Sequence, residues 1–256
     1  MGKTTTLSLI EQARQKLKEL VVEHELERQD VVLEVMPLDR KEAIGEKARA
    51  DLPLVTGEEN LIEARILGAR GQAYTDSRSH FRGSLRSVLG LPLDSNYRRS
   101  ILLATLNAAC AHFGLIDRVV HCVEHEPDKC GAEMASTLRQ RHGEGTIGVI
   151  GYNPAVAEHM VSEFGADNVC IGDLREKYIG QEKFGIKIWD ANHRGSELVE
   201  AADAVLLTGT TLVWNTADPI IEQCRALKRP CHFFGVTAAA VSHLCGVDRL
   251  CPFGRS

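Results

Sequence analysis

The feature that most constrains the fold is an alternation of short apolar runs and helical segments that continues from Thr146 to the last strand signal. The first run is apolar and β-branched, which is typical of a strand buried on both faces, and Gly151 ends it. Alternation of this length predicts an α/β fold with a parallel sheet and right-handed crossovers. Five strands are expected, with Ser196 and Thr216 as helix caps: Thr146–Ile150, Val169–Ile171, Ile186–Trp189, Ala204–Leu207 and Cys231–Phe234.

Composition excludes several classes of protein. The net charge is −5, and no basic run with interleaved aromatic residues occurs, so nucleic acid is not an expected partner. No apolar stretch approaches the ~20 residues of a membrane span, and the N-terminus lacks the pattern of a signal peptide. The eight cysteines form no CxxC pair and no dense framework, which favours reduced thiols. The sequence therefore predicts a cytoplasmic protein without membrane partners.

The first half of the chain is less regular. An amphipathic helix is expected from Leu7 to about Arg28, and Arg98–Phe113 is apolar almost all round, as in a buried helix. Asn107 in its middle needs hydrogen-bond partners, and a structural bond is favoured over a catalytic role. Short strands are expected at Val31–Val35 and Leu61–Leu67, residues 38–56 have no clear assignment, and residues 68–85 form a glycine-rich polar loop. That loop is either a surface connection or a contributor to a cleft.

The segment His121–Cys130 (HCVEHEPDKC) concentrates the ligand types of a zinc-like or softer metal. Its metal-ligand candidates are His121, Cys122 and Glu126. Pro127 is expected as the first residue of a helix, with Glu126 at the cap, and this breaks the spacing that a helical His pair would need. A metal site, a structural loop with a cap, and a polar catalytic segment remain alternatives. We expect the three candidates to line a cleft without forming a closed four-ligand site.

In an open parallel sheet, ligands bind at the carboxyl ends of the strands. Asn153-Pro154 opens a helix there, and the free N–H groups at its start favour an anionic or polar ligand. The motif is not GxGxxG, so no dinucleotide is implied. No nucleophile elbow or Ser-His-Asp order is present, so a reaction does not follow from these residues. The strand ends carry Gly151, Tyr152, Asn153, Asp173, Asp190, Thr208, Gly209, Thr210, Thr211, Gly235 and Thr237.

Several motifs together resemble the heavy-metal-chelation family of uncharacterised bacterial and archaeal proteins. They are YTD at Tyr74–Asp76 with a following F-x-G, the HC…EP…C segment, GYNPA, TGTTLVWNT, and FGVT with the closing CPFG. The likeness runs from about Leu61 to the end. It implies an enolase N-terminal-like α+β domain over residues 1–115 and a Rossmann-like doubly wound domain over residues 116–256. The cleft between them would hold the ligand, and Tyr74, Asp76 and Asn215 join the expected ligand-binding residues.

Two functions follow from the resemblance. One is an enzyme that condenses or hydrolyses a flavin-, pterin- or siderophore-like molecule in the interdomain cleft. The other is a metal-binding or metallophore-handling protein without turnover. An S-adenosylmethionine-dependent methyltransferase is disfavoured because no GxGxG turn follows the first strand. A small molecule is the expected partner, a metal ion is the candidate cofactor, and self-association into a homo-oligomer is left open.

Overall fold

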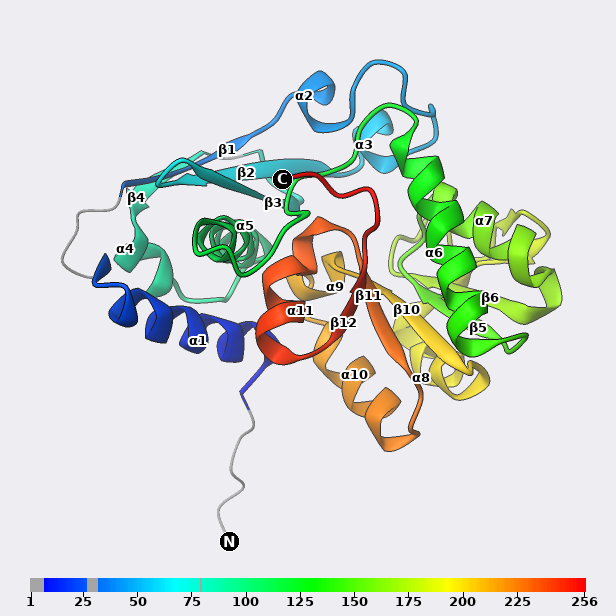
Figure 1. The fold of residues 1–256 in the computed structure, drawn as a ribbon. Coiled ribbons are helices and arrows are strands. Elements are labelled where there is room, and N and C mark those ends of the chain that lie inside the picture. The colour runs from blue at the N-terminus through cyan, green and yellow to red at the C-terminus, as the bar shows by residue number, and fades with distance from the viewer. Residues whose placement is uncertain (1–6, 27–31, 79) are drawn as a thin grey trace, which may run out of the picture.

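Two sheets of different type form the framework of the molecule. The computed structural model describes residues 7–26, 32–78 and 80–256. A four-stranded antiparallel sheet has the order β3-β2-β1-β4, and a six-stranded parallel sheet has the order β12-β11-β10-β5-β6-β9. A small hairpin, β7-β8, stands apart from both. The expected α/β class is therefore confirmed, as Figure 1 shows.

The antiparallel sheet comes from the first half of the chain. Its strands are β1 (Val32–Pro37), β2 (Asn60–Ile66), β3 (Ala69–Thr75) and β4 (Phe81–Ser84). The buried helix α5 (Asn96–His112) packs against β2 and β3. The remaining elements of this half are α1 (Leu9–Glu23), α2 (Arg40–Ile44), α3 (Pro53–Thr56) and α4 (Leu85–Leu89). The expected helix Leu7–Arg28 is thus shorter, and its proposed end at residues 27 and 28, like Val31 of the first expected strand, lies outside the described residues.

The expected loop over residues 68–85 is wrong, because the segment contains β3 and β4. Two of its small and polar residues, Gly71 and Gln72, pack inside the molecule. A Cβ atom on Gly71 would lie 2.2 Å from the backbone nitrogen of Ala108, so glycine lets β3 lie directly on α5. Gln72 is buried and donates from Nε2 to the buried Glu63 at 2.9 Å. An apolar alternation was therefore not needed to form these strands.

The parallel sheet consists of β5 (Ile147–Ile150), β6 (Val169–Asp173), β9 (Trp189–Asp190), β10 (Ala204–Thr208), β11 (Cys231–Phe234) and β12 (Asp248–Leu250). The expectation of five strands misses β12, which is only three residues long and carries Asp248 and Arg249. The expected strand Ile186–Trp189 is split. Its first part, β8 (Ile186–Lys187), pairs with β7 (Glu182–Lys183), and only β9 joins the main sheet.

Helices cover both faces of the parallel sheet. Val149 of β5 belongs to the same apolar cluster as Val156 of α7. A Cβ atom on the neighbouring Gly148 would instead meet Leu198 of α8 at 2.7 Å. The helices and short 3-10 turns of this half are α6 (Glu126–His142), α7 (Pro154–Phe164), η2 (Ala166–Asn168), α8 (Ala191–Ala201), α9 (Thr210–Val213), α10 (Ala217–Ala226), η3 (Val236–Ala238) and α11 (Ala239–Cys245).

Two of the three expected helix caps need correction. Helix α8 begins earlier than expected, because Asp190 rather than Ser196 caps it by accepting from the backbone N–H of Asn192 at 2.9 Å. Thr216 is the cap residue of α10, as expected, although its side chain makes no hydrogen bond to the helix. The cap position of α6 is His125, and Glu126 is the first helical residue.

One buried amide joins the two halves of the molecule. Asn107 of α5 donates from Nδ2 to the carbonyl oxygens of Gln72 at 2.8 Å and Val236 at 2.9 Å. Its Oδ1 accepts from the backbone N–H of Ala240 at 2.8 Å. This agrees with the structural role expected for Asn107. Apolar residues from α1, α5, α11 and the parallel sheet share one core cluster, so the division at residues 115 and 116 stays a prediction.

None of the described helices combines the length and apolar character that a membrane crossing requires.

Candidate functional site

A cavity of about 750 Å³ lies where the carboxyl ends of the parallel strands face the antiparallel sheet. Residues just before β2 and at the end of β3 form one side, and the loops after β5, β6 and β10 form the other. Many of the expected ligand-binding and metal-binding residues line it: Tyr74, Asp76, His121, Cys122, Gly151, Tyr152, Asn153, Asp173, Thr208, Gly209, Thr210 and Thr237. Asn215 and Glu126 are not among the lining residues. That any of these residues binds a ligand stays a prediction.

The backbone after β5 shapes one wall of the cavity. Gly151 has φ of +95°, and a Cβ atom there would lie 2.2 Å from Cγ2 of Thr208, so both conformation and space require glycine. Asn153 caps α7, its Oδ1 accepting from the N–H groups of Ala155 at 3.0 Å and Val156 at 3.3 Å. The free N–H groups expected at this helix start are therefore partly satisfied by the protein itself.

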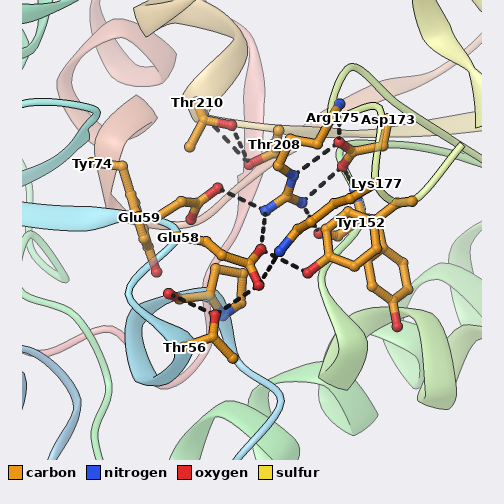
Figure 2. A network of polar contacts seen from close by, with 12 residues as sticks. Thr56, Glu58, Glu59, Tyr74, Tyr152, Asp173, Arg175, Lys177, Thr208 and Thr210 are labelled. Atoms are coloured by element: carbon orange, nitrogen blue, oxygen red, sulfur yellow. Dashed lines mark hydrogen bonds and ion pairs between the residues drawn. The ribbon is translucent and has the colours of Figure 1, made fainter.

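A polar network adjoins this wall, and Figure 2 shows its members converging on Arg175. Arg175 donates from Nε to Oδ1 of Asp173 at 2.9 Å and from Nη2 to Oδ2 at 2.8 Å. It also donates to the carbonyl of Tyr152 at 2.6 Å. Burial alone would lower the pKa of Arg175, but the hydrogen bonds and charge of Asp173 raise it above its usual range. The guanidinium is thus a fixed positive charge at the cavity.

Glu58 belongs to this network and is fully engaged. Its Oε1 accepts from Thr56 Oγ1 at 2.8 Å and pairs with Lys177, while its Oε2 accepts from the Tyr178 hydroxyl at 2.7 Å. Burial raises the pKa of Glu58, but the hydrogen bonds from Lys177 and Tyr178 outweigh burial and lower it overall. Glu58 is therefore held as a carboxylate whose oxygens already have partners.

Glu59, the next residue, is placed very differently. Its one close polar partner is Arg175, whose Nη1 lies 3.4 Å from Oε1. Burial raises the pKa of Glu59 to about 7, against the opposing charge of Arg175. The side chain of Glu59 is 26% exposed and lines the cavity. Two adjacent glutamates thus present one neutralised carboxylate and one that exchanges a proton near neutral pH.

Sequence reasoning missed Glu58, Glu59 and Arg175. The only local signals are two consecutive acidic residues before a strand and the spacing Asp173-x-Arg175 after another. Neither identifies a site without knowing that the two segments meet in space.

The remaining wall carries His121 and three thiols. The Tyr74 hydroxyl lies 2.9 Å from Nε2 of His121, whose buried Nδ1 has no hydrogen-bond partner. Burial lowers the pKa of His121 to about 4, so the ring is neutral at physiological pH. The thiols of Cys122, Cys130 and Cys251 line the same wall, and interaction with Cys122 raises the pKa of Cys130 to about 12. All eight cysteines are free thiols.

The proposed metal ligands have other structural roles as well. Oε2 of Glu126 accepts from the backbone N–H of Val123 at 2.8 Å, which turns this carboxylate back onto its own loop. The backbone N–H of His121 donates to Gln72 Oε1 at 2.7 Å. Within the described part of the chain, no group of three or more His, Cys, Asp or Glu side chains is arranged to hold a metal ion. Metal binding at His121, Cys122 and Glu126 stays a prediction.

Part of the chain resembles a known protein family. Residues 134–249 match the family model DUF364, whose description reads "Putative heavy-metal chelation". This part of the chain is therefore similar to the DUF364 family. No protein with a curated description matches the sequence.

Solved structures of DUF364 proteins resemble this chain. One is a protein of unknown function from Pyrococcus horikoshii, which has a TM-score of 0.55 and 15% identity and covers 90% of this chain and 80% of its own. Another is a DUF364 protein of unknown function from Desulfitobacterium hafniense, with a TM-score of 0.48 and 17% identity over 73% of this chain and 72% of its own. The first likeness supports the fold.

Proposed function

We propose that this protein binds a polar small molecule with a ring system, flavin-, pterin- or siderophore-like, in the cavity between its two sheets. The observation that carries the proposal is the cavity itself: about 750 Å³, at the carboxyl ends of parallel strands, lined by apolar side chains together with the ionised network around Arg175. Ligand sites in proteins have this size and this mixture of apolar surface with few convergent polar groups. The topological position is the usual one for ligands in open parallel sheets.

Condensation or hydrolysis of the bound molecule is the reaction class proposed for it. Support comes from Glu59, because a carboxyl group with a pKa of about 7 can both give and take a proton near neutral pH. It lines the cavity within 3.4 Å of a guanidinium that stabilises its charged form. The second candidate is a metallophore-handling protein without turnover, in which a metal enters already held by its chelator. The absence of a three-ligand group among the described residues favours that form over direct metal binding.

A thermal-shift screen tests the proposal. Riboflavin, biopterin, 2,3-dihydroxybenzoate and its ferric complex are added separately to the full chain. A ligand at ~100 times its dissociation constant adds ~2.7 kcal/mol of stability, which such a screen detects readily. Stabilisation that is weakened in Asn153→Asp, which keeps the cap of α7 but places a negative charge in the cavity lining, supports binding there. No stabilisation by any of the four compounds, with the apo protein folded, contradicts this proposal.

The same screen separates the two candidates. The chromatographic recovery of each stabilising compound is followed after incubation with the protein. A changed compound indicates an enzyme, whereas an unchanged compound bound only with its metal indicates chelate handling.

A further inference from the structure

The charges around the cavity are unbalanced. Among the described residues that line it, four carry carboxylates, namely Glu58, Glu59, Asp76 and Asp173, and one, Arg175, carries a fixed positive charge. Arg175 is committed to Asp173, and Lys177 from outside the lining neutralises Glu58. Asp76 accepts from Asn96 at 2.6 Å near the exposed rim. Glu59 is left without a full counter-charge, and Figure 2 shows it between Tyr74 and Arg175.

The backbone N–H donors around the start of α7 are already used. Asn153 accepts the N–H groups of Ala155 and Val156 at the start of α7. Oδ2 of Asp173 accepts the N–H of Tyr152 at 2.6 Å. A phosphate or carboxylate entering here would find these N–H groups occupied and carboxylates beside it. The N–H groups of Ala155 and Val156 at this helix start therefore already have a partner within the protein.

We propose that the ligand of this cavity presents a cationic or N–H-rich nitrogen head, such as an amidine or an amino-substituted ring, and that Glu59 is its counter-ion. This rests on the proposed binding function and narrows it to a class of ligand. An amidine offers two parallel N–H donors, which match the two oxygens of a carboxylate in a bidentate pair. A bare metal ion is a poorer match, because no three ligating side chains converge among the described residues.

Binding of such a head is coupled to the ionisation of Glu59. In the empty cavity, burial holds its pKa at about 7, and a bound cation favours the carboxylate and releases the proton to solvent. The groups that interact with Glu59 are the neighbouring Glu58 and, from other elements, Arg175, Asp173, Lys177 and Tyr74. The pKa values of Arg175 and Tyr74 are raised, that of Glu58 is lowered, and His121 behind Tyr74 has a pKa of about 4. The change of affinity between pH 6 and 8 is therefore assigned to Glu59.

Three probes with one phenyl ring and different heads test the proposal: benzamidine is cationic, benzamide neutral and benzoate anionic. Their dissociation constants are measured by NMR titration against the full chain at pH 8. We expect benzamidine to bind most tightly and benzoate least tightly. In Glu59→Gln, benzamidine binding should weaken about 10-fold or more and benzamide binding less than about 2-fold. The matched control is Glu197→Gln, which removes the same charge from an exposed ion pair with Arg194 on α8 and should change neither.

The pH dependence gives a second, independent readout. With a pKa of about 7, the ionised fraction of Glu59 rises from about a tenth at pH 6 to about nine tenths at pH 8. Benzamidine binding should strengthen up to about 9-fold over this range in the parent and stay flat in Glu59→Gln. Binding that weakens as pH rises would mean that neutral Glu59 acts as a donor, and would overturn the proposal. Failure of benzamidine to bind at millimolar concentration would overturn it as well.

The failure of this proposal can be told from failure of the proposed function. An anionic compound from the thermal-shift screen that binds equally well to Glu59→Gln would leave small-molecule binding standing and would refute the counter-ion role. Absence of any stabilising compound in that screen would refute both.

Discussion

Replacing Arg175 with methionine tests the polar network most directly. Methionine keeps an apolar stem where the Arg175 guanidinium now lies 4.7 Å from the ring centroid of Tyr178. The change leaves Asp173, whose side chain is 4% exposed, without its counter-charge. Removing one partner of a buried ion pair costs about 3–5 kcal/mol. Asp173 keeps two backbone donors, Tyr152 at 2.6 Å and residue 175 itself at 2.7 Å, so we expect the lower end, about 3 kcal/mol.

Urea unfolding at pH 7 measures this loss, and the melting temperature should fall by about 6–12 °C. Adding Asp173→Asn to Arg175→Met removes the orphaned charge, so the double variant should be more stable than the sum of the two single losses implies. Arg194→Met serves as the control, because its pair with Glu197 is largely exposed and should cost far less. A loss in Arg175→Met no larger than in Arg194→Met, or full additivity in the double variant, would refute the reasoning.

Four further expectations concern single positions. Folding raises the pKa of Glu59 from 4.5 to about 7, so the protonated side chain favours the folded state and this contribution is lost as the pH rises from 5 to 8. Glu59→Gln should remove this loss, so the variant should be more stable than the parent at pH 8 by up to about 3 kcal/mol more than it is at pH 5, measured by urea unfolding at both pH values. Gly151→Ala should cost several kcal/mol in the same assay, since its Cβ meets Thr208 at 2.2 Å, and the loss should shrink in Thr208→Ser/Gly151→Ala if the contact is the cause. Asn107→Leu should cost about 3 kcal/mol or more, because two carbonyls and one N–H lose buried partners, and a near-neutral result would contradict its joining role. Asn153→Asp should keep the melting temperature of the parent while Asn153→Ala loses about 1 kcal/mol, since a carboxylate also caps α7.

The sequence predicted those secondary-structure elements that have a strong local pattern of apolar residues. The run Thr146–Ile150 and the helix after Pro154 were located within a residue of β5 and α7, because a buried strand and a capped helix each have a local signature. Strand β12 was missed since an edge strand of three residues needs no apolar run. Strands β3 and β4 were missed because their glycine and polar residues are explained only by what packs against them, such as α5 on Gly71.

Some residues of the candidate site could likewise be predicted from the sequence, and others could not. Residues at the strand ends, such as Asn153 and Thr208, could be placed at one cavity because parallel strands bring their carboxyl ends to one edge. Glu59 and Arg175 could not, because their meeting joins segments separated by more than a hundred residues. The raised pKa of Glu59 depends on its burial and on the segments that surround it in the folded protein, so no local sequence pattern predicts it.

The position of α5 has a consequence for any attempt to divide the chain. Its apolar side chains, including Leu103 and Leu106, belong to the same cluster as Val241 of α11 and Phe233 of β11, and Asn107 bonds to backbone on both sides. A fragment that starts at residue 116 would lose this cover and expose the surface that α5 now buries. We expect such a fragment to aggregate or bind hydrophobic dye when made alone, and to recover a native-like structure when the preceding fragment is co-expressed. The cavity, whose walls come from both fragments, would then form only on reassembly, which makes ligand binding a reporter of complementation between the two pieces.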